Sequence, residues 1–204
     1  ETVHGDSFLI GKYELTQGQV QALGEQVQAL GRPGSSNFGD ETYTARNPEE
    51  SVLGPVVSAW LPHFGLRLPT TTEWEVAARA GSGTIWGVGD RVEALQGHAN
   101  VADATLARAT EIGRSGDERV EDGFLSHAPV GSFLPNAFGL HDVLGNVAEL
   151  TTANSPTGIM LFFARGGSFM LKPVDCRLGS VRHVMPNQTT PEIGLRVARS
   201  LRRD

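Results

Sequence analysis

The stretch from Gly81 to Asn136 constrains the fold most, because it has almost no periodic apolar pattern. Helices repeat apolar residues roughly every 3.6 positions and half-buried strands every second position. A stretch this long without such a pattern is uncommon inside a compact domain and needs something to hold it in place. The chain has 1 cysteine, so an intramolecular disulfide is excluded. Bound metal is the natural alternative, because an ion held by the folded chain contributes folding free energy.

The segment before this stretch predicts a strand and two helices. Residues 7–15 have the composition of a strand. Thr16 and Gln19 have the spacing of a capping box, which should begin a helix that ends near Gly31. A second, short helix is expected over residues 56–61, between two prolines.

The sequence RLPTTTEWEVAARAG predicts a third helix with clear boundaries. Two alternative capping boxes are possible at its start, Thr70 with Glu73 or Thr72 with Glu75. Gly81 should end the helix. Short strand-like runs return in the last third of the chain. The helix residues expected to face the core are Trp74, Ala77 and Ala78, and internal ion pairs are expected for Arg67, Arg165, Arg177 and Arg196.

Charge and hydropathy argue against two classes of partner. The net charge is −6 with acidic and basic residues interspersed, so a nucleic-acid partner is not indicated. No apolar run approaches the roughly 18 residues that span a bilayer, so no membrane span is expected. The start ETVHGDSF has no signal-peptide pattern. It resembles the interior of a domain more than the beginning of a chain, so we expect an upstream domain or segment. The compartment stays open.

Two groups of oxygen-bearing side chains lie in or just after the irregular stretch. The first combines the Asn100 amide with the Asp122 carboxylate, and the second combines Asp142 with Glu149. Carboxylate, amide and carbonyl oxygens are the ligands that Ca²⁺ takes, usually about six to eight of them. Neither group has EF-hand spacing, and Asp and Asn in turns often bond only to nearby backbone. From the residues alone, both interpretations stay open.

In their order and spacing, the motifs of this chain resemble the formylglycine-generating enzyme (sulfatase-modifying factor) family. The motifs that carry the resemblance are IGKYELTQGQ, GLRLPTTTEWEVAARAG, ANVAD, EDGFLSHAPVGSFLPNAFGLHDVLGNVAEL, ARGGSF, CRLGSVR and EIGLRVAR. They extend from residue 8 to residue 199. The resemblance implies an α+β fold class, a compact C-type-lectin-like fold with much irregular structure. It also implies a single domain over residues 1–204 that lacks the family's usual first strand.

The resemblance implies two structural Ca²⁺ sites. The first would use the side chains of Asn100 and Asp122 and the carbonyls of Val101 and Phe124. The second would use the side chains of Asp142 and Glu149 and the carbonyls of Gly145 and Val147. The loop between Val101 and Asp122 is longer than the family's usual connection, so the first site is where this chain departs from the pattern.

Cys176 is the candidate for redox chemistry. The resemblance implies that formylglycine-generating members oxidise a substrate cysteine with two active-site cysteines that bind copper(I), a soft ion suited to thiolates. Cys176 stands at the second of these positions and Leu171 at the first. Leucine cannot ligate copper, so neither copper nor formylglycine generation is expected, and Cys176 is interpreted as a small packing residue. If the chain is an enzyme, Cys176 and Ser168 are the candidate catalytic residues.

We therefore expect a non-catalytic, calcium-stabilised domain that presents residues 165–191 to a protein, peptide or other ligand. The resemblance implies that this segment lines the family's ligand groove, and that retroelements diversify it in some relatives, the variable proteins. The alternatives are an oxidoreductase related to formylglycine-generating or peptide-metabolite-maturing enzymes, and a regulatory domain of a larger protein. Leu178 and Val181 belong to the same expected binding surface, but they are explained equally well as core residues. The expected ligand-binding residues are Ser168, Phe169, Met170, Leu171, Lys172, Pro173, Val174, His183 and Met185.

Overall fold

Two small sheets organise the chain, whose computed structural model describes residues 7–24, 44–109 and 116–201. The first sheet pairs β1 (Phe8–Ile10) with β6 (Ala198–Ser200), so the beginning and end of the described chain lie together. The second has the order β4-β3-β2-β5 and consists of β2 (Ala148–Asn154), β3 (Met160–Arg165), β4 (Arg182–Val184) and β5 (Ile193–Gly194). β2 is antiparallel to β3 and parallel to β5, and β3 is antiparallel to β4. This mixture of helix and sheet is the α+β class expected from the sequence.

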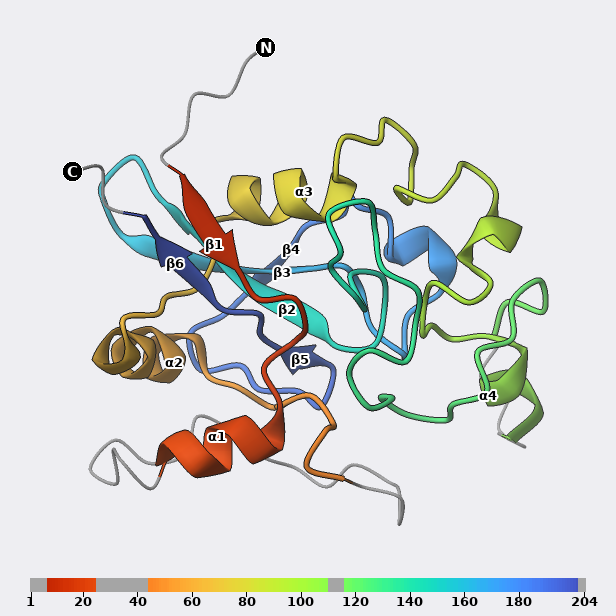
Figure 1. Cartoon of the computed structure of the whole chain (residues 1–204), viewed down its shortest axis with the longest axis horizontal. Helices are drawn as coiled ribbons and strands as arrows, with labels where there is room; N and C mark the ends of the chain where they lie inside the picture. Colours follow the sequence, from red (N-terminus) through yellow and green to blue (C-terminus); the bar gives the residue numbers. More distant parts are fainter. Residues whose placement is uncertain (1–6, 25–43, 110–115, 202–204) are drawn as a thin grey trace.

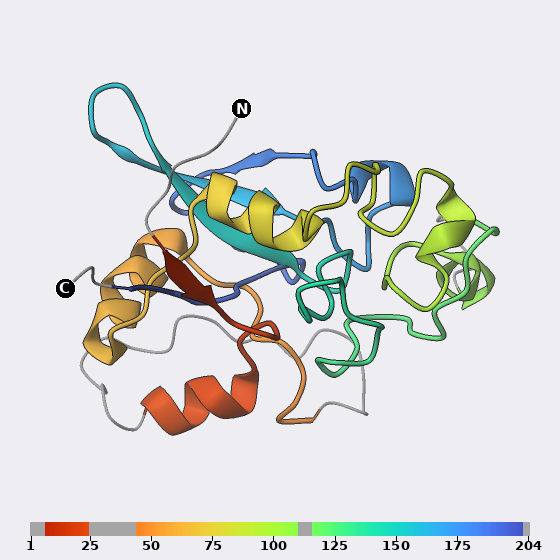
Figure 2. The ribbon, with the colours of Figure 1, turned by 45° about the horizontal axis from the view of Figure 1, so that its top comes forward.

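The helices lie on both sides of the larger sheet (Figures 1 and 2). α3 covers one side, and α1 and α2 lie on the other, where Trp60 of α2 joins a core with Leu150 and Phe162 of the sheet. Among the described residues, no helix is long and apolar enough to cross a membrane. The bounds are α1 (Gln17–Gly24), α2 (Gly54–Trp60), α3 (Thr71–Arg79) and α4 (Ala104–Ala109), with 3₁₀ turns η2 (Leu61–Phe64), η3 (Val92–Leu95) and η4 (Pro173–Asp175).

Two of the three predicted helix starts are confirmed by their capping bonds. The Thr70 hydroxyl accepts from the Glu73 backbone N–H at 3.2 Å, while the Glu73 carboxylate accepts from the Thr70 N–H at 2.8 Å. Thr16 and Gln19 form the same reciprocal pair. The alternative start at Thr72 is wrong, because the helix already begins at Thr71.

Other predicted boundaries are shifted or untested. α3 ends at Arg79, two residues before the predicted glycine, and Ala80 caps it in a left-handed conformation with φ of 47°. The short helix predicted over residues 56–61 extends instead over Gly54–Trp60, and the strand predicted over residues 7–15 is regular only at Phe8–Ile10. The predicted end of α1 at Gly31 lies outside the described residues.

The described parts of the stretch from 81 to 136, residues 81–109 and 116–136, are irregular as predicted, apart from η3, α4 and isolated turns. Side-chain oxygens and amides hold its turns. The Asn136 amide donates to the carbonyls of Ala77 and Ala78 at the end of α3, at 2.8 and 3.0 Å. The Asp103 carboxylate accepts from the N–H groups of Thr105 and Leu106 at the start of α4. Polar side chains therefore supply many of the bonds that helices and strands supply elsewhere.

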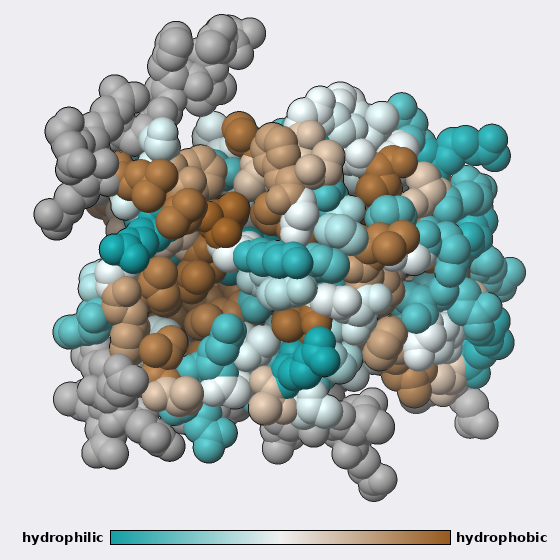
Figure 3. Space-filling model, in the orientation of Figure 1, coloured by the Kyte–Doolittle hydropathy of each residue, from teal (hydrophilic) through white to brown (hydrophobic). Residues whose placement is uncertain are grey.

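A second apolar core lies between α3 and this stretch. The predicted inward residues Trp74, Ala77 and Ala78 are buried there, against Leu144 and Leu178. The surface over β1 and β6 is rich in apolar side chains, including the exposed Leu9 and Leu201, whereas the end that carries α4 is hydrophilic (Figure 3).

Candidate functional site

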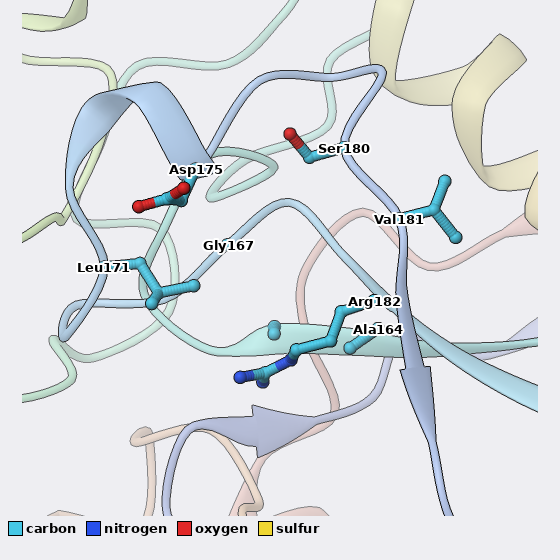
Figure 4. A pocket seen from close by; sticks show the side chains of 8 residues that line it. Ala164, Gly167, Leu171, Asp175, Ser180, Val181 and Arg182 are labelled. Atoms are coloured by element: carbon cyan, nitrogen blue, oxygen red, sulfur yellow. The ribbon is translucent and has the colours of Figure 1, made fainter.

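A groove of about 400 Å³ lies between the larger sheet and the segment that follows β3 (Figure 4). Its floor comes from β2 and β3, and its walls come from the turn around η4 and from the start of β4. Six of its eight lining residues belong to the predicted segment 165–191, and the other two belong to β2 and β3. Its lining residues are Ala148, Ala164, Gly167, Leu171, Asp175, Ser180, Val181 and Arg182.

Only one of the predicted ligand-binding residues, Leu171, lines this groove. Val174, Met185, Lys172 and His183 are exposed, and Met170 is half-buried. These five lie on the surface of the same segment, where a large partner can reach them.

Three other predicted ligand-binding residues are buried and contact distant parts of the chain. The Ser168 hydroxyl donates to the Glu192 carboxylate at 2.9 Å, and the Phe169 ring packs edge-on against His127. Pro173 is buried, and its carbonyl accepts from the Trp86 indole at 2.9 Å.

The sequence did not single out Asp175, Ser180 or Arg182, which also line the groove. Arg182 comes to the groove because β4 pairs with β3 and sets it opposite Ala164. The run Val181–Val184 has two adjacent polar residues, Arg182 and His183, so the sequence carries no local signal for which of them faces the groove. Of the two residues left open, Leu178 belongs to the core and Val181 is exposed.

Cys176 is fully buried behind the groove wall. Its Sγ lies 3.8 Å from the Leu171 carbonyl oxygen and 3.9 Å from that of Ser168. Gly167 packs against it so closely that a Cβ there would lie 2.8 Å from the Cys176 Cα. Burial raises the pKa of the Cys176 thiol to about 12, so the protonated form predominates at neutral pH. This environment supports the packing interpretation of Cys176.

The thiol should therefore be unreactive in the native protein. With dithionitrobenzoate at pH 8, we expect no measurable release of thionitrobenzoate over an hour, because reaction requires an accessible thiolate. The same sample in 6 M guanidinium chloride should titrate to 1 thiol per chain. Reaction of the native protein at the rate of the unfolded chain would show that Cys176 is exposed and ionised.

The first predicted metal-ligand set contains an uncompensated buried oxygen. The Asn100 amide nitrogen donates to the Ser126 carbonyl and the Asn146 Oδ1, at 3.0 and 3.1 Å. These bonds fix the amide, and its Oδ1 is buried without a hydrogen-bond partner among the described residues. In the same predicted set, the Asp122 carboxylate accepts from the N–H groups of Val101 and Phe124. Burial, the largest cause, raises the pKa of Asp122 from its ordinary 3.8 to about 7. This donor set fits a hard cation.

The second predicted set has a different arrangement. Both oxygens of Glu149 accept from the Arg196 guanidinium, at 2.6 to 3.0 Å, and one also accepts from the Trp74 indole at 2.6 Å. Asp142 accepts from the backbone N–H groups of Gly131 and Phe133. Each Glu149 oxygen therefore already has two donors, so the second set does not fit a calcium ion in this arrangement. Among the described residues, no three His, Cys, Asp or Glu side chains are grouped to hold a metal.

Glu14 completes the charge cluster around Arg196. Its carboxylate accepts from the Asn146 amide at 2.6 Å and from the Val147 N–H at 3.2 Å. Burial, followed by repulsion from Asp142 and Glu149, raises the pKa of Glu14 well above its ordinary value. Arg196 thus faces three buried or nearly buried carboxylates and is itself fully buried.

The arginines expected in internal ion pairs divide into two groups. Arg196 pairs with Glu149, Arg165 pairs with Glu75 at 2.7 Å, and Arg67 pairs with Glu73 at 2.7 Å. Arg177 is exposed and forms no ion pair with another described residue. Its position at the outer side of the turn before β4 turns its side chain to solvent, so that expectation was wrong.

Comparison with known proteins connects this geometry to one family. The family model of the sulfatase-modifying factor enzyme 1-like domain matches residues 1–201. The inactive C-alpha-formylglycine-generating enzyme 2 of Mus musculus is 32% identical over 148 residues, 67% of this chain and 44% of its own. The formylglycine-generating enzyme of Streptomyces coelicolor is 31% identical over 179 residues, 78% of this chain and 54% of its own. The chain therefore spans about half the length of these curated relatives.

Solved structures show the same fold. CarF aligns with a TM-score of 0.71 at 22% identity, over 96% of this chain and 87% of its own. The variable protein 1 of Treponema denticola aligns with a TM-score of 0.70 at 20% identity, over 95% and 84%. Together with the family model, these likenesses show that the chain belongs to the formylglycine-generating enzyme, or sulfatase-modifying factor, family.

Proposed function

We propose that this chain is a non-catalytic binding domain whose groove between the larger sheet and η4 receives a segment of a protein or peptide. The observation that carries the proposal is that the groove is open while the thiol of Cys176 is buried and does not face it. Leu171 lines the groove where copper chemistry would need a cysteine, and Cys176 is fully buried behind the wall. A groove of this size, with both apolar and polar lining, suits a few residues of a bound chain.

Two similarities support a non-catalytic role. One relative bears the name of an inactive formylglycine-generating enzyme, and one solved neighbour is a variable protein. The exposed residues around the groove, among them Val174, Val181 and Met185, give the partner adaptable apolar surface. A larger partner would contact these residues together with the groove.

We also propose a structural Ca²⁺ at the first ligand set, held by the Asn100 and Asp122 side chains and by the carbonyls of Val101 and Phe124. The support is the unpartnered Asn100 Oδ1 and the raised pKa of Asp122, both of which indicate a missing positive charge. Bound there, the ion would neutralise Asp122 and hold two distant parts of the irregular stretch together. The proposal does not extend to the second set, because Arg196 occupies its glutamate.

A displayed library of random peptides tests the groove. Peptides enriched on the wild-type protein should bind at least tenfold more weakly to Val181→Arg, because the long side chain fills the groove from its rim. Ile159→Arg is the matched control: Ile159 is exposed but belongs to the turn after β2, and its variant should bind as the wild type does. Failure to enrich any peptide, or equal binding to the two variants, would contradict the proposal.

A second measurement separates binding from oxidation. With copper(I) and a cysteine-containing peptide, we expect no oxygen uptake above the protein-free control, because Leu171 offers no thiolate to the ion. Peptide-dependent oxygen uptake would show that the chain is an oxidoreductase and would overturn the non-catalytic proposal.

A further inference from the structure

Arg182 is the one basic residue among the described residues that line the groove. It begins β4 and lies opposite Ala164 of β3. Figure 4 shows its side chain running along the floor of the groove, with the guanidinium pointing toward the side where Leu171 and Asp175 lie. The side chain therefore borders the space that a ligand would fill, while its Nη2 is enclosed by the protein.

This guanidinium has fewer partners than it can bind. Its Nη1 lies 3.8 Å from the Glu192 carboxylate, which is too far for a hydrogen bond. Its Nη2 has no contact with solvent and no hydrogen-bond partner among the described residues. Glu192 cannot easily move closer, because its other oxygen accepts from the Ser168 hydroxyl at 2.9 Å. A guanidinium carries five N–H donors, and those on Nη2 of Arg182 have no acceptor among the described residues.

The chemistry of the groove selects a carboxylate over other acceptors. The planar guanidinium matches the two oxygens of a carboxylate with two parallel hydrogen bonds once its enclosed Nη2 turns toward the groove, and the opposite charge strengthens both. Asp175 and Glu192 add negative charge nearby, which repels a dianion such as phosphate more strongly than it repels a monoanion. A single carboxylate is therefore the anion that suits this site.

The rest of the lining is suited to an apolar group next to that carboxylate. Leu171, Val181, Ala148 and Ala164 all line the same groove. In a polypeptide, a carboxylate directly beside an apolar side chain occurs at the C-terminus of a chain that ends in an apolar residue.

We infer that the groove captures the C-terminal apolar residue of a peptide, whose α-carboxylate binds Arg182 and whose side chain packs on Leu171 and Val181. This inference rests on the proposed binding function of the groove. Arg182 is the residue that would determine specificity for a free C-terminus, and Glu192 competes with the ligand for it.

The test compares acetyl-Ala-Ala-Leu with a free carboxylate, the same peptide as its C-terminal amide, and acetyl-Ala-Asp-Leu amide, each titrated into the ¹⁵N-labelled protein. The free acid should bind at least tenfold more tightly than either amide. Arg182→Gln should reduce binding of the acid to the level of the amide. Glu192→Gln should strengthen it several-fold, because the competing charge is removed while the acceptor for Ser168 remains.

Arg199→Gln is the matched control, since Arg199 is an exposed arginine on β6, and it should leave binding unchanged. The opposite effects expected at Arg182 and Glu192 separate recognition from loss of folding, which circular dichroism checks for each variant. Equal binding of acid and amide, tighter binding of the aspartate peptide, or tighter binding of inorganic phosphate would overturn the inference. If Val181→Arg still weakens the binding of library peptides in that case, the proposed function stands and only the carboxylate inference fails.

Discussion

Replacing Arg196 with leucine should lower the free energy of unfolding by about 3–5 kcal/mol, the range measured when one partner of a buried ion pair is removed. Arg196 is fully buried, pairs with both oxygens of Glu149 and donates to the carbonyls of Gly11 and His141. Without it, Glu14, Asp142 and Glu149 would lie together in the interior with no cation between them. Urea denaturation followed by tryptophan fluorescence measures the effect, because the Trp74 indole donates to the Glu149 carboxylate and reports on its surroundings.

Arg199→Leu provides the matched control for this experiment. Arg199 lies in the same C-terminal segment but is exposed, so its loss should change stability by no more than about 0.5 kcal/mol. Adding Glu149→Leu to Arg196→Leu should recover part of the lost stability, because it removes one unpaired charge. A cost below about 1 kcal/mol for Arg196→Leu would show that the cluster does not depend on its cation.

Calcium should give the second large effect. At a free concentration of about 100 times its Kd, Ca²⁺ should stabilise the metal-free protein by about 2.7 kcal/mol, which is about 5–10 °C in Tm for a chain of this size. Asn100→Ala and Asp122→Asn should abolish this shift, because each removes a proposed side-chain ligand. Asp117→Asn, in the same irregular stretch but paired on the surface with Arg119, should keep it.

The pH dependence of the metal-free protein tests the same site. In the unfolded chain Asp122 ionises near its ordinary 3.8, whereas burial holds its pKa at about 7 in the folded state. The folded state therefore binds the extra proton between these values, and the contribution of Asp122 to stability falls as the pH rises from about 4 to about 7. Calcium needs the ionised carboxylate, so the stabilisation that it provides should grow over the same range. A calcium-induced Tm shift that is equal at pH 5 and pH 7.5 would contradict a role for Asp122.

Elements defined by neighbouring residues were predictable from the sequence. The reciprocal bonds of Thr70 with Glu73 depend on a spacing of three residues, and both the start of α3 and its buried face were found where expected. The irregular stretch was also predicted, because the absence of periodicity is itself visible in the sequence.

For interactions between residues distant in the sequence, the type of interaction could be predicted but the partner could not. Arg196 was expected in an internal ion pair, but its pairing with Glu149 and its proximity to Glu14 depend on how the two sheets meet. The groove shows the same limit. Arg182 reaches it through the pairing of β4 with β3, whereas Ser168 and Pro173 turn inward to Glu192 and Trp86, partners distant in the sequence.

The alternation of buried and exposed residues in the groove wall has a consequence for how specificity can evolve. Pro173, Cys176 and Leu178 are anchored in the interior, while Val174 and Val181 face outward from the same segment. Substitutions at the outward positions alter what the wall presents without disturbing its anchors. We therefore expect substitutions at Val174 and Val181 to change the proposed binding preferences at little cost to folding, because exposed residues seldom change stability by more than about 0.5 kcal/mol.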